Sequence, residues 1–325
     1  MTARPRVLLT NPIHPDIHPT LAAQAEVIVA PDTSANTLRR YVADVQGLIV
    51  RASLPADIFD HAPHLRAVVR HGVGLDMIPM EAANQHRIPV ANVPGSNTSA
   101  VVEYCIAAML TLRRPLAAID RALRHDGWTK ARPLADNTAE LDGLVCGIVG
   151  VGAIGSRLAQ AAAGLGMTVH GLTRRPESLP PGIQPATREA LFARADIIVL
   201  CCPLTDATRG LVSAEMINLM KPGAILINVS RGPVVDTSAL LNALCRGHVG
   251  GAALDVHDIQ PLPPDSPVLN APNLLLTPHI AGITDSSMRR MSQGAIDNLL
   301  ALLQGERAPN IVNPHVLSAP FSSAS

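Results

Sequence analysis

Short apolar runs separated by helical stretches form the pattern of the first hundred residues. Helical segments such as Leu38–Val45 alternate with runs typical of buried strands, the last of which is Ile88–Asn92. The earlier strand-like runs are Val7–Thr10, Val27–Val29, Gly47–Val50 and Ala67–Val69. This alternation predicts a parallel sheet covered by helices, and hence a small α/β domain.

The same alternation resumes after a long apolar helix, Ala100–Leu112, which we interpret as a connector between domains. Six strand-like runs follow it: Val145–Val149, Met167–Leu172, Asp196–Cys202, Ala224–Val229, Gly250–Val256 and Leu274–Thr277. Helical segments separate them, at Ser156–Leu165, Leu191–Ala193, Ala214–Leu219 and Ser238–Arg246. A final helix, Ser286–Leu303, would return the chain to the first domain.

A glycine-rich loop, residues 150–155, joins the first of these six strands to its helix. Gly150 allows a tight turn, Gly152 lets backbone N–H groups approach a pyrophosphate, and Gly155 lets the helix pack closely on its strand. G-x-G-x-x-G alone is a weak signal, but one placed in a complete strand–turn–helix–strand is strong. We therefore expect a dinucleotide at the start of this helix, in contact with the three glycines, Ala153 and Ile154.

The end of the next strand indicates which dinucleotide binds. Proteins that bind NAD place an Asp or Glu there to hold the ribose 2′-hydroxyl. In this chain Thr173, Arg174 and Arg175 follow the strand, and no carboxylate is present. A guanidinium is always charged and binds phosphate in bidentate fashion, so we expect these residues to bind NADP(H), with NAD(H) possible. The alternative is that both arginines belong to a solvated loop.

These patterns together predict an α/β protein with two Rossmann-like domains. Each domain is expected to hold a doubly wound parallel sheet, with the nucleotide domain inserted in the substrate domain. The substrate-binding (catalytic) domain comprises residues 1–98 and 286–325, and the dinucleotide-binding domain residues 99–285. Residues 318–325 are rich in Ser, Ala and Pro, and we expect a disordered tail there.

Composition limits the partners. The 26 basic residues balance the 26 acidic ones, which gives no electrostatic reason to expect nucleic acid or an anionic membrane. No apolar run approaches the roughly 18 residues of a membrane span. Five cysteines at unpaired spacings, and an N-terminus without a signal-peptide core, predict a cytoplasmic protein with buried thiols. We expect no metal site.

Two chemically active side chains follow strand-like runs of the predicted nucleotide domain. Arg231 follows Ala224–Val229 and His279 follows Leu274–Thr277. Ligands of open α/β sheets bind beyond the carboxyl ends of the strands. There Arg231 would bind a carboxylate and polarise a carbonyl, and His279 would exchange a proton with the hydroxyl. Each residue taken singly is more often structural, but their shared placement favours the reduction of a small 2-oxo acid.

The chain resembles the D-isomer-specific 2-hydroxyacid dehydrogenases from about Gly47 to Asn313. Several ordered motifs carry the resemblance: residues 71–76 (HGVGLD), the glycine loop, and residues 228–232 (NVSRG), 253–256 (ALDV) and 277–279 (TPH). The resemblance implies two domains with the active site in a cleft between them, and a homodimer. It also implies hydride transfer between nicotinamide and a small 2-oxo or 2-hydroxy acid, of which glyoxylate and hydroxypyruvate are the leading candidates.

The resemblance also implies roles for particular residues. Backbone N–H groups near Val73 and Gly74 would bind the substrate carboxylate together with Arg231. Asp255 would contact the nicotinamide carboxamide. Further contacts to the dinucleotide are implied for Thr98, Pro203, Val229 and Gly282.

One position departs from the family pattern. The family usually pairs its histidine with a glutamate, and this chain has Gln260 there. A carboxylate would raise the pKa of the imidazole, whereas an amide orients the ring without charge. With the cationic Arg231 nearby, we expect His279 to titrate lower than in the usual enzyme. Asp258 could supply the missing charge, although a solvent-facing loop acid is the interpretation we favour.

Three alternatives stay open from sequence alone. An NAD-dependent enzyme could act on a substituted lactate, or on formate, since formate dehydrogenases also resemble this chain at Gln260 and Asn97. A binding protein that senses NAD(P), like the family's corepressors, is the alternative from another class. Finally, His71 could line the pocket, although we favour a polar residue satisfied at a strand end.

Overall fold

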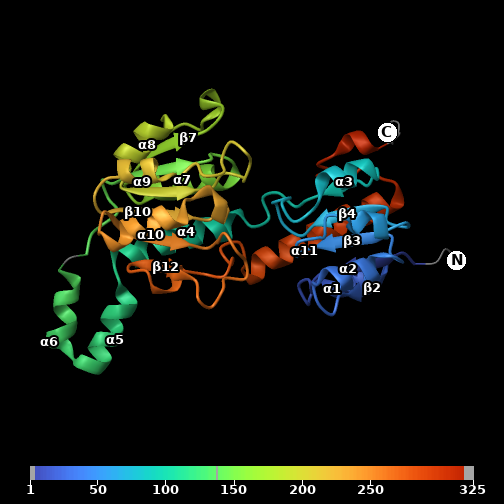
Figure 1. The fold of residues 1–325 in the computed structure, drawn as a ribbon, viewed down its shortest axis with the longest axis horizontal. Coiled ribbons are helices and arrows are strands. Elements are labelled where there is room, and N and C mark those ends of the chain that lie inside the picture. The colour runs from blue at the N-terminus through green and yellow to red at the C-terminus, as the bar shows by residue number, and fades with distance from the viewer. Residues whose placement is uncertain (1–3, 137, 318–325) are drawn as a thin grey trace. The chain divides into compact units, whose positions relative to one another are not determined.

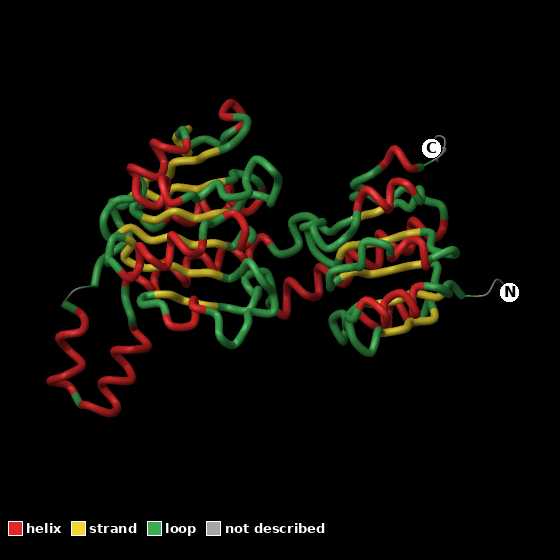
Figure 2. The backbone as a smooth tube through the Cα atoms, in the orientation of Figure 1, coloured by secondary structure: helices red, strands yellow, loops and turns green. Residues whose placement is uncertain are grey.

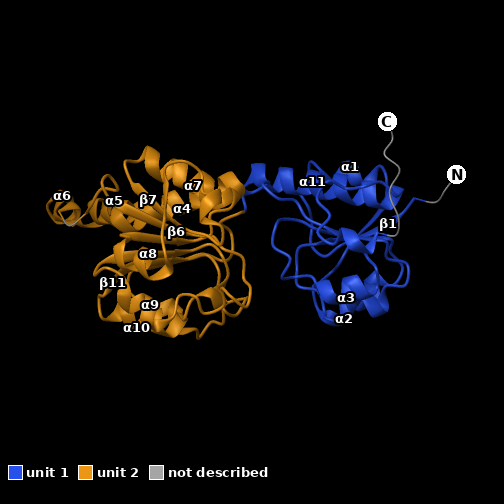
Figure 3. Cartoon of the chain, turned by 90° about the horizontal axis from the view of Figure 1, so that it is seen from above, with its two compact units in different colours: residues 1–97, 283–325 blue, residues 98–282 orange. Residues whose placement is uncertain are grey.

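The structure is a computed structural model that describes residues 4–136 and 138–317, and it divides into two compact units (Figure 3). Unit 1 comprises residues 1–97 and 283–325, and unit 2 comprises residues 98–282. Unit 1 is therefore built from two separate stretches of chain, and the whole of unit 2 lies between them in the sequence. The expected tail, residues 318–325, lies outside the described residues.

Unit 1 contains a five-stranded parallel sheet with the strand order β2-β1-β3-β4-β5 (Figures 1 and 2). Its strands are β1 (Arg6–Leu9), β2 (Glu26–Val29), β3 (Gly47–Val50), β4 (Ala67–Arg70) and β5 (Val90–Ala91). Its helices are α1 (His18–Ala22), α2 (Ala35–Val42), α3 (Met80–Gln85) and α11 (Asp285–Gln304).

Side chains of β3 alternate between two cores, as they must in a strand buried on both faces. Ile49 packs in the core that includes Leu299 of α11, whereas Leu48 and Val50 pack in the core that includes Leu38 of α2. Helices therefore cover both faces of the sheet.

Unit 2 contains a seven-stranded parallel sheet with the order β12-β11-β10-β9-β6-β7-β8. Its strands are β6 (Val145–Val149), β7 (Thr168–Leu172), β8 (Ile183–Pro185), β9 (Ile197–Leu200), β10 (Ala224–Asn228), β11 (Val249–Leu254) and β12 (Leu274–Leu276). Its helices are α4 (Thr98–Arg113), α5 (Leu116–Asp126), α6 (Trp128–Ala131), α7 (Ala153–Gly164), α8 (Arg188–Arg194), α9 (Ala214–Leu219) and α10 (Thr237–Cys245).

This sheet is doubly wound as well. Ile197 of β9 packs in the core that contains residues of α4 and α7, and Ile198 packs in the core that contains residues of α8, α9 and α10. The strand order reverses at β6, which lies between β7 and β9. Two parallel, doubly wound α/β units confirm the predicted fold class.

The structure also differs from the sequence-based expectations. The strand expected over residues 88–92 is only Val90–Ala91, and α7 begins at Ala153, three residues before the expected start. Helices α5 and α6 were not predicted, although Leu116, Ile119 and Leu123 recur at helical spacing along α5. Cys245 is exposed, contrary to the expected burial of the thiols.

No helix among the described residues is long and apolar enough to cross a membrane. Within the same residues, no group of three or more His, Cys, Asp and Glu side chains is arranged to hold a metal ion.

Candidate active site

Six neighbouring strands of unit 2 have their carboxyl ends in register. Leu172, Val149, Leu200, Asn228, Leu254 and Leu276 are successive register partners across β7, β6, β9, β10, β11 and β12. Because the strands are parallel, the loops that follow these residues all leave from the same edge of the sheet. The glycine loop, the arginines after β7, Arg231, Gln260 and His279 therefore share this edge.

The glycine loop fits a dinucleotide phosphate. A Cβ on Gly155 would lie 2.3 Å from the Gly150 carbonyl oxygen, so this contact between helix and strand requires glycine. A Cβ on Gly152, in contrast, would meet nothing within 4 Å, and this space is open to a ligand. Gly152 is the N-cap of the 12-residue helix α7 and gives it no side-chain cap. Backbone N–H groups and the positive helix end thus face an unfilled space, which suits a pyrophosphate.

Arg174 and Arg175 are exposed directly after β7, the strand next to the glycine loop. Neither guanidinium forms an ion pair with any residue that the structure describes. The Thr173 hydroxyl accepts a hydrogen bond from the Arg175 backbone N–H at 3.4 Å. This strand end therefore presents two positive charges without a carboxylate to neutralise them.

Arg231 is held by its own loop. Asn228, fully buried at the end of β10, donates from Nδ2 to the Arg231 carbonyl oxygen at 2.9 Å and accepts from the Ser230 N–H at 3.0 Å. The Arg231 guanidinium donates to the Ser230 carbonyl oxygen at 2.6 Å and is half-buried. Both bonds of Asn228 fix the backbone from which the guanidinium extends.

The loop after β10 packs directly on the loop after β11. A Cβ on Gly232 would lie 2.2 Å from the His257 carbonyl carbon, so only glycine fits at this position. This contact brings the segment that carries Gln260 to the side of Arg231.

His279 and Gln260 are in contact. The His279 Nδ1 and the Gln260 Oε1 lie 3.0 Å apart, and the Gln260 Nε2 donates to the His257 carbonyl oxygen at 3.3 Å. Because a carbonyl oxygen only accepts, the second bond fixes the amide with its oxygen towards His279. His279 therefore carries its proton on Nδ1, and Nε2 is the nitrogen that would exchange a proton with a substrate. Asp258 is exposed, and its carboxylate accepts from the Thr237 hydroxyl at 2.7 Å.

Asp255 lies under the turn that carries His279. Its side chain is 1 % exposed and accepts from Ile280 N–H at 2.7 Å and Ala281 N–H at 2.9 Å. Its backbone oxygen accepts from His279 N–H at 2.8 Å. His279 has a φ of 58°, in the left-handed region that non-glycine residues adopt only when their surroundings impose it. The hydrogen bonds to Asp255 hold His279 in this conformation. The contact between Asp255 and the nicotinamide carboxamide, which the family resemblance implies, stays a prediction.

In unit 1, the loop after β4 presents two backbone donors. Val73 and Gly74 donate their N–H groups to no acceptor among the described residues. Asn92 Nδ2 and Arg70 Nε hold the carbonyl oxygens of Val73 and Gly74 at 2.8 and 3.1 Å. The carbonyls are thus engaged while the N–H groups remain available for an anion.

His71, next to this loop, is a buried and satisfied residue. It is 3 % exposed, and its Nε2 lies 2.8 Å from the Ser292 hydroxyl. Burial, with the charges of Arg51 and Arg70, lowers the pKa of His71 to about 3. The ring is therefore neutral, which agrees with the structural role rather than with selection of a charged substrate.

The remaining predicted cofactor residues lie at the same edge or at the ends of unit 2. Pro203 and Val229 follow β9 and β10, whereas Thr98 and Gly282 are the first and last residues of unit 2. Sequence reasoning missed Asn228 and His257, which orient Arg231 and Gln260. Their signals were the polar character of strand-end positions and, for Asn228, its place in the motif of residues 228–232.

The chain is similar to several known proteins. Residues 106–281 match the family model "D-isomer specific 2-hydroxyacid dehydrogenase, NAD binding domain". A glyoxylate reductase from Aeropyrum pernix is 35 % identical over 97 % of both chains. An NADPH-dependent glyoxylate/hydroxypyruvate reductase from Sinorhizobium meliloti, solved with NADP and malonate, is 31 % identical, with a TM-score of 0.85 over 95 % of this chain and 97 % of that one. A Thermus thermophilus protein is 36 % identical, with a TM-score of 0.86 over 94 % of this chain and 99 % of that one.

Proposed function

This chain belongs to the D-isomer-specific 2-hydroxyacid dehydrogenase family, and we propose that it reduces glyoxylate or hydroxypyruvate with NADPH as the preferred cofactor. It is an NAD(P)-dependent oxidoreductase of 2-hydroxy and 2-oxo acids. The observation that carries the proposal is the shared strand edge of unit 2, which holds the glycine loop, Arg231 and the oriented pair His279–Gln260.

Arg231 binds and polarises the substrate in this proposal. Its guanidinium donates to the carboxylate and to the carbonyl oxygen, on which negative charge develops during reduction. The unpaired N–H groups of Val73 and Gly74 bind the same carboxylate. The bound nicotinamide supplies or accepts the hydride.

His279 moves the proton. Its Nε2 donates to the carbonyl oxygen of a 2-oxo acid, or accepts from the hydroxyl in the reverse direction. Gln260 fixes the ring through Nδ1–H but adds no negative charge to stabilise the imidazolium. We therefore expect reduction to require a lower pH than it would with a glutamate at this position.

The proposed preference for NADPH rests on the end of β7. Two exposed guanidinium groups stand there without a carboxylate partner, and a 2′-phosphate would supply their negative charge. Thr173, adjacent to them, would leave room for that phosphate where a larger acidic side chain would repel it.

Initial rates with glyoxylate, hydroxypyruvate and larger 2-oxo acids, each with NADPH and NADH, test the proposal. We expect turnover of both small acids, faster with NADPH. A higher kcat/KM with NADH would contradict the cofactor preference. Tight NADPH binding without turnover of any acid would favour a nucleotide-sensing binding protein. NAD⁺ reduction by formate or by substituted lactates would favour those alternatives.

Thr173→Asp combined with Arg174→Ala tests the strand end itself. The new carboxylate would accept from a ribose 2′-hydroxyl and repel a 2′-phosphate, so we expect the preference to move towards NADH by about tenfold or more. Arg246→Ala, which removes an exposed arginine of unit 2 after α10, is the matched control and should leave the ratio unchanged.

We also propose that the protein is a cytoplasmic homodimer. The dimer is supported by an exposed apolar arm formed by α5, α6 and the 3₁₀ turn η2 (Arg132–Ala135) (Figure 1). Leu116, Leu123, Trp128 and Leu134 of this arm are 62, 43, 73 and 45 % exposed. Apolar side chains gathered on one projecting element are typical of a surface covered by a partner.

A further inference from the structure

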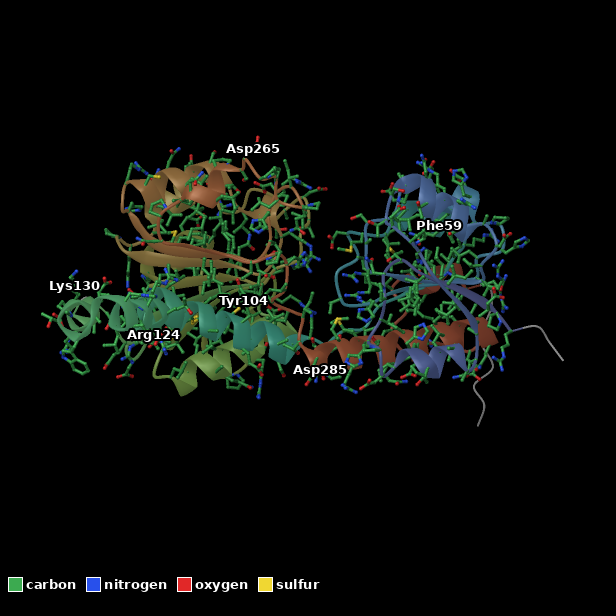
Figure 4. The ribbon with its side chains drawn as sticks, turned by 90° about the horizontal axis from the view of Figure 1, so that it is seen from below. Phe59, Tyr104, Arg124, Lys130, Asp265 and Asp285 are labelled. Carbon is green, nitrogen blue, oxygen red and sulfur yellow. The ribbon has the colours of Figure 1, made fainter. Side chains whose placement is uncertain are left out.

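We propose that Tyr104, on helix α4, is a positioning residue for the catalytic His279. This inference rests on the proposed function and assigns a role to a residue outside the family motifs. The Tyr104 hydroxyl lies 2.7 Å from the Thr277 hydroxyl, two residues before His279 (Tyr104 is labelled in Figure 4). Tyr104 is therefore joined by a short contact to the strand end that carries the histidine.

The direction of the hydrogen bonds is fixed by Asp255. The Thr277 hydroxyl lies 2.6 Å from the Asp255 Oδ1, and a carboxylate only accepts, so Thr277 donates its single proton to Asp255. Tyr104 must therefore donate to the Thr277 oxygen. Burial raises the pKa of Tyr104 to about 12, so the phenol keeps this proton throughout the range in which a histidine titrates.

The hydrogen bonds beyond Thr277 form a closed ring. His279 donates to the Asp255 carbonyl oxygen at 2.8 Å, and Asp255 accepts from Thr277. The Thr277 carbonyl oxygen accepts from His257 Nε2 at 3.0 Å, the His257 carbonyl oxygen accepts from Gln260, and Gln260 accepts from His279 Nδ1. Five residues thus fix both the backbone and the imidazole of His279.

Tyr104 attaches this ring to a helix outside it. The five ring residues all lie in the loops after β11 and β12, and all of them except Asp255 are half-buried or exposed. Helix α4, in contrast, packs its buried side chains Val101, Val102 and Cys105 in the core beneath the sheet. The hydrogen bond from Tyr104 therefore links a helix that is fixed by core packing to the turn in which His279 adopts an unfavourable backbone conformation.

Substitution Tyr104→Phe removes the hydroxyl and keeps the ring, so the core should stay filled. Losing one hydrogen bond that holds the catalytic turn is expected to lower kcat by about tenfold. The KM for the 2-oxo acid should change little, since Arg231 binds it. The Tyr41→Phe variant is a matched control because Tyr41 is the only other tyrosine in the chain and lies in unit 1.

A double-mutant cycle separates this role from a general effect on the fold. If Tyr104 acts through Thr277, then Tyr104→Phe should have no further effect on kcat in a Thr277→Val background. Thr277→Ser, which keeps the hydroxyl, should retain the dependence on Tyr104. The inference would be overturned if Tyr104→Phe lowered kcat by the same factor in the wild-type and Thr277→Val backgrounds. It would also be overturned if Tyr104→Phe left the wild-type kcat unchanged.

A titration that needs no turnover decides the inference independently of the proposed function. The His279 imidazole can be followed by NMR with ¹³C-labelled histidine, its signal assigned by its loss in His279→Ala. An imidazolium makes a stronger hydrogen bond to Gln260 than the neutral ring does, so a loosened contact lowers the His279 pKa. We expect a lower pKa in Tyr104→Phe and the wild-type pKa in Tyr41→Phe. Identical titrations in all three proteins would overturn the role of Tyr104 even if the wild type reduces glyoxylate.

Discussion

The pair His279–Gln260 shows how one residue change alters the chemistry of a site while keeping its geometry. The Gln260 amide accepts from Nδ1 at 3.0 Å and is itself held by His257. An amide can therefore orient the ring as a carboxylate would. What it lacks is the negative charge that stabilises the imidazolium.

Gln260→Glu should restore that charge and raise the apparent pKa of His279. The kcat/KM of reduction, which needs the protonated imidazole, should then extend to higher pH, by about one unit for a single adjacent carboxylate. The pH profile of both proteins with the same 2-oxo acid measures the effect. A profile that does not move would show that residue 260 does not set the titration of His279.

His71 gives a pH-dependent contribution to stability. Its folded pKa of about 3 lies below the ordinary value of 6.5, so the folded state binds fewer protons than the unfolded state between these values. Stability is retained above about pH 6.5 and falls as the pH drops below it. His71→Gln, which can still bond to Ser292, removes this linkage.

Urea unfolding at pH 7.5 and pH 5 tests the linkage at His71. From pH 7.5 to pH 5, the free energy of unfolding of the wild type should fall by up to about 2 kcal/mol more than that of His71→Gln. All other titrating groups are common to both proteins, so they cancel in the difference. An equal fall in the free energy of unfolding of the wild type and His71→Gln would contradict a neutral, buried His71.

At the scale of elements, the glycine loop between β6 and α7 combines two requirements that substitutions can separate. Gly155 is needed for packing, since its Cβ would lie 2.3 Å from a backbone oxygen. Gly152 has a φ of −97° that any residue can adopt, and its Cβ would meet no protein atom within 4 Å. Packing and ligand binding thus depend on different glycines of one motif.

Gly155→Ala should destabilise the protein by about 1–3 kcal/mol because the loop must shift. Gly152→Ala should stay within about 0.5 kcal/mol of wild-type stability but weaken NADPH binding by on the order of tenfold or more. Chemical unfolding and calorimetric titration with NADPH measure the two effects. Wild-type affinity in Gly152→Ala would contradict a pyrophosphate at this position.

At the scale of the whole molecule, the arm of α5, α6 and η2 predicts the oligomeric state. Arg124 and Lys130 mark this arm in Figure 4. Light scattering should give a mass about twice the 34.1 kDa of the chain. Leu116→Glu combined with Trp128→Glu should shift the mass towards one chain, because two charges would be buried in an apolar contact.

Leu219→Glu is the control, since Leu219 is 43 % exposed on α9, outside the arm. Trp128 is the only tryptophan of the chain, so its emission reports on the arm directly. We expect a red shift on dilution of the wild type as Trp128 becomes hydrated. A single-chain mass at high concentration would contradict the proposed dimer.

The sequence by itself determined the two parallel α/β domains, the glycine loop and the placement of Arg231 and His279 at strand ends. These features depend on local periodicity, and parallel strands bring their carboxyl ends to one edge whatever packs around them. Tertiary structure alone decided the orientation of the Gln260 amide, the burial of His71 and the ring of hydrogen bonds around Asp255. Those depend on neighbours distant in sequence, as when Ser292 meets His71 or Tyr104 meets Thr277. The arm was decided by tertiary structure as well: Leu116 and Leu123 recur at helical spacing, but only the structure shows that they are exposed and not packed in a core.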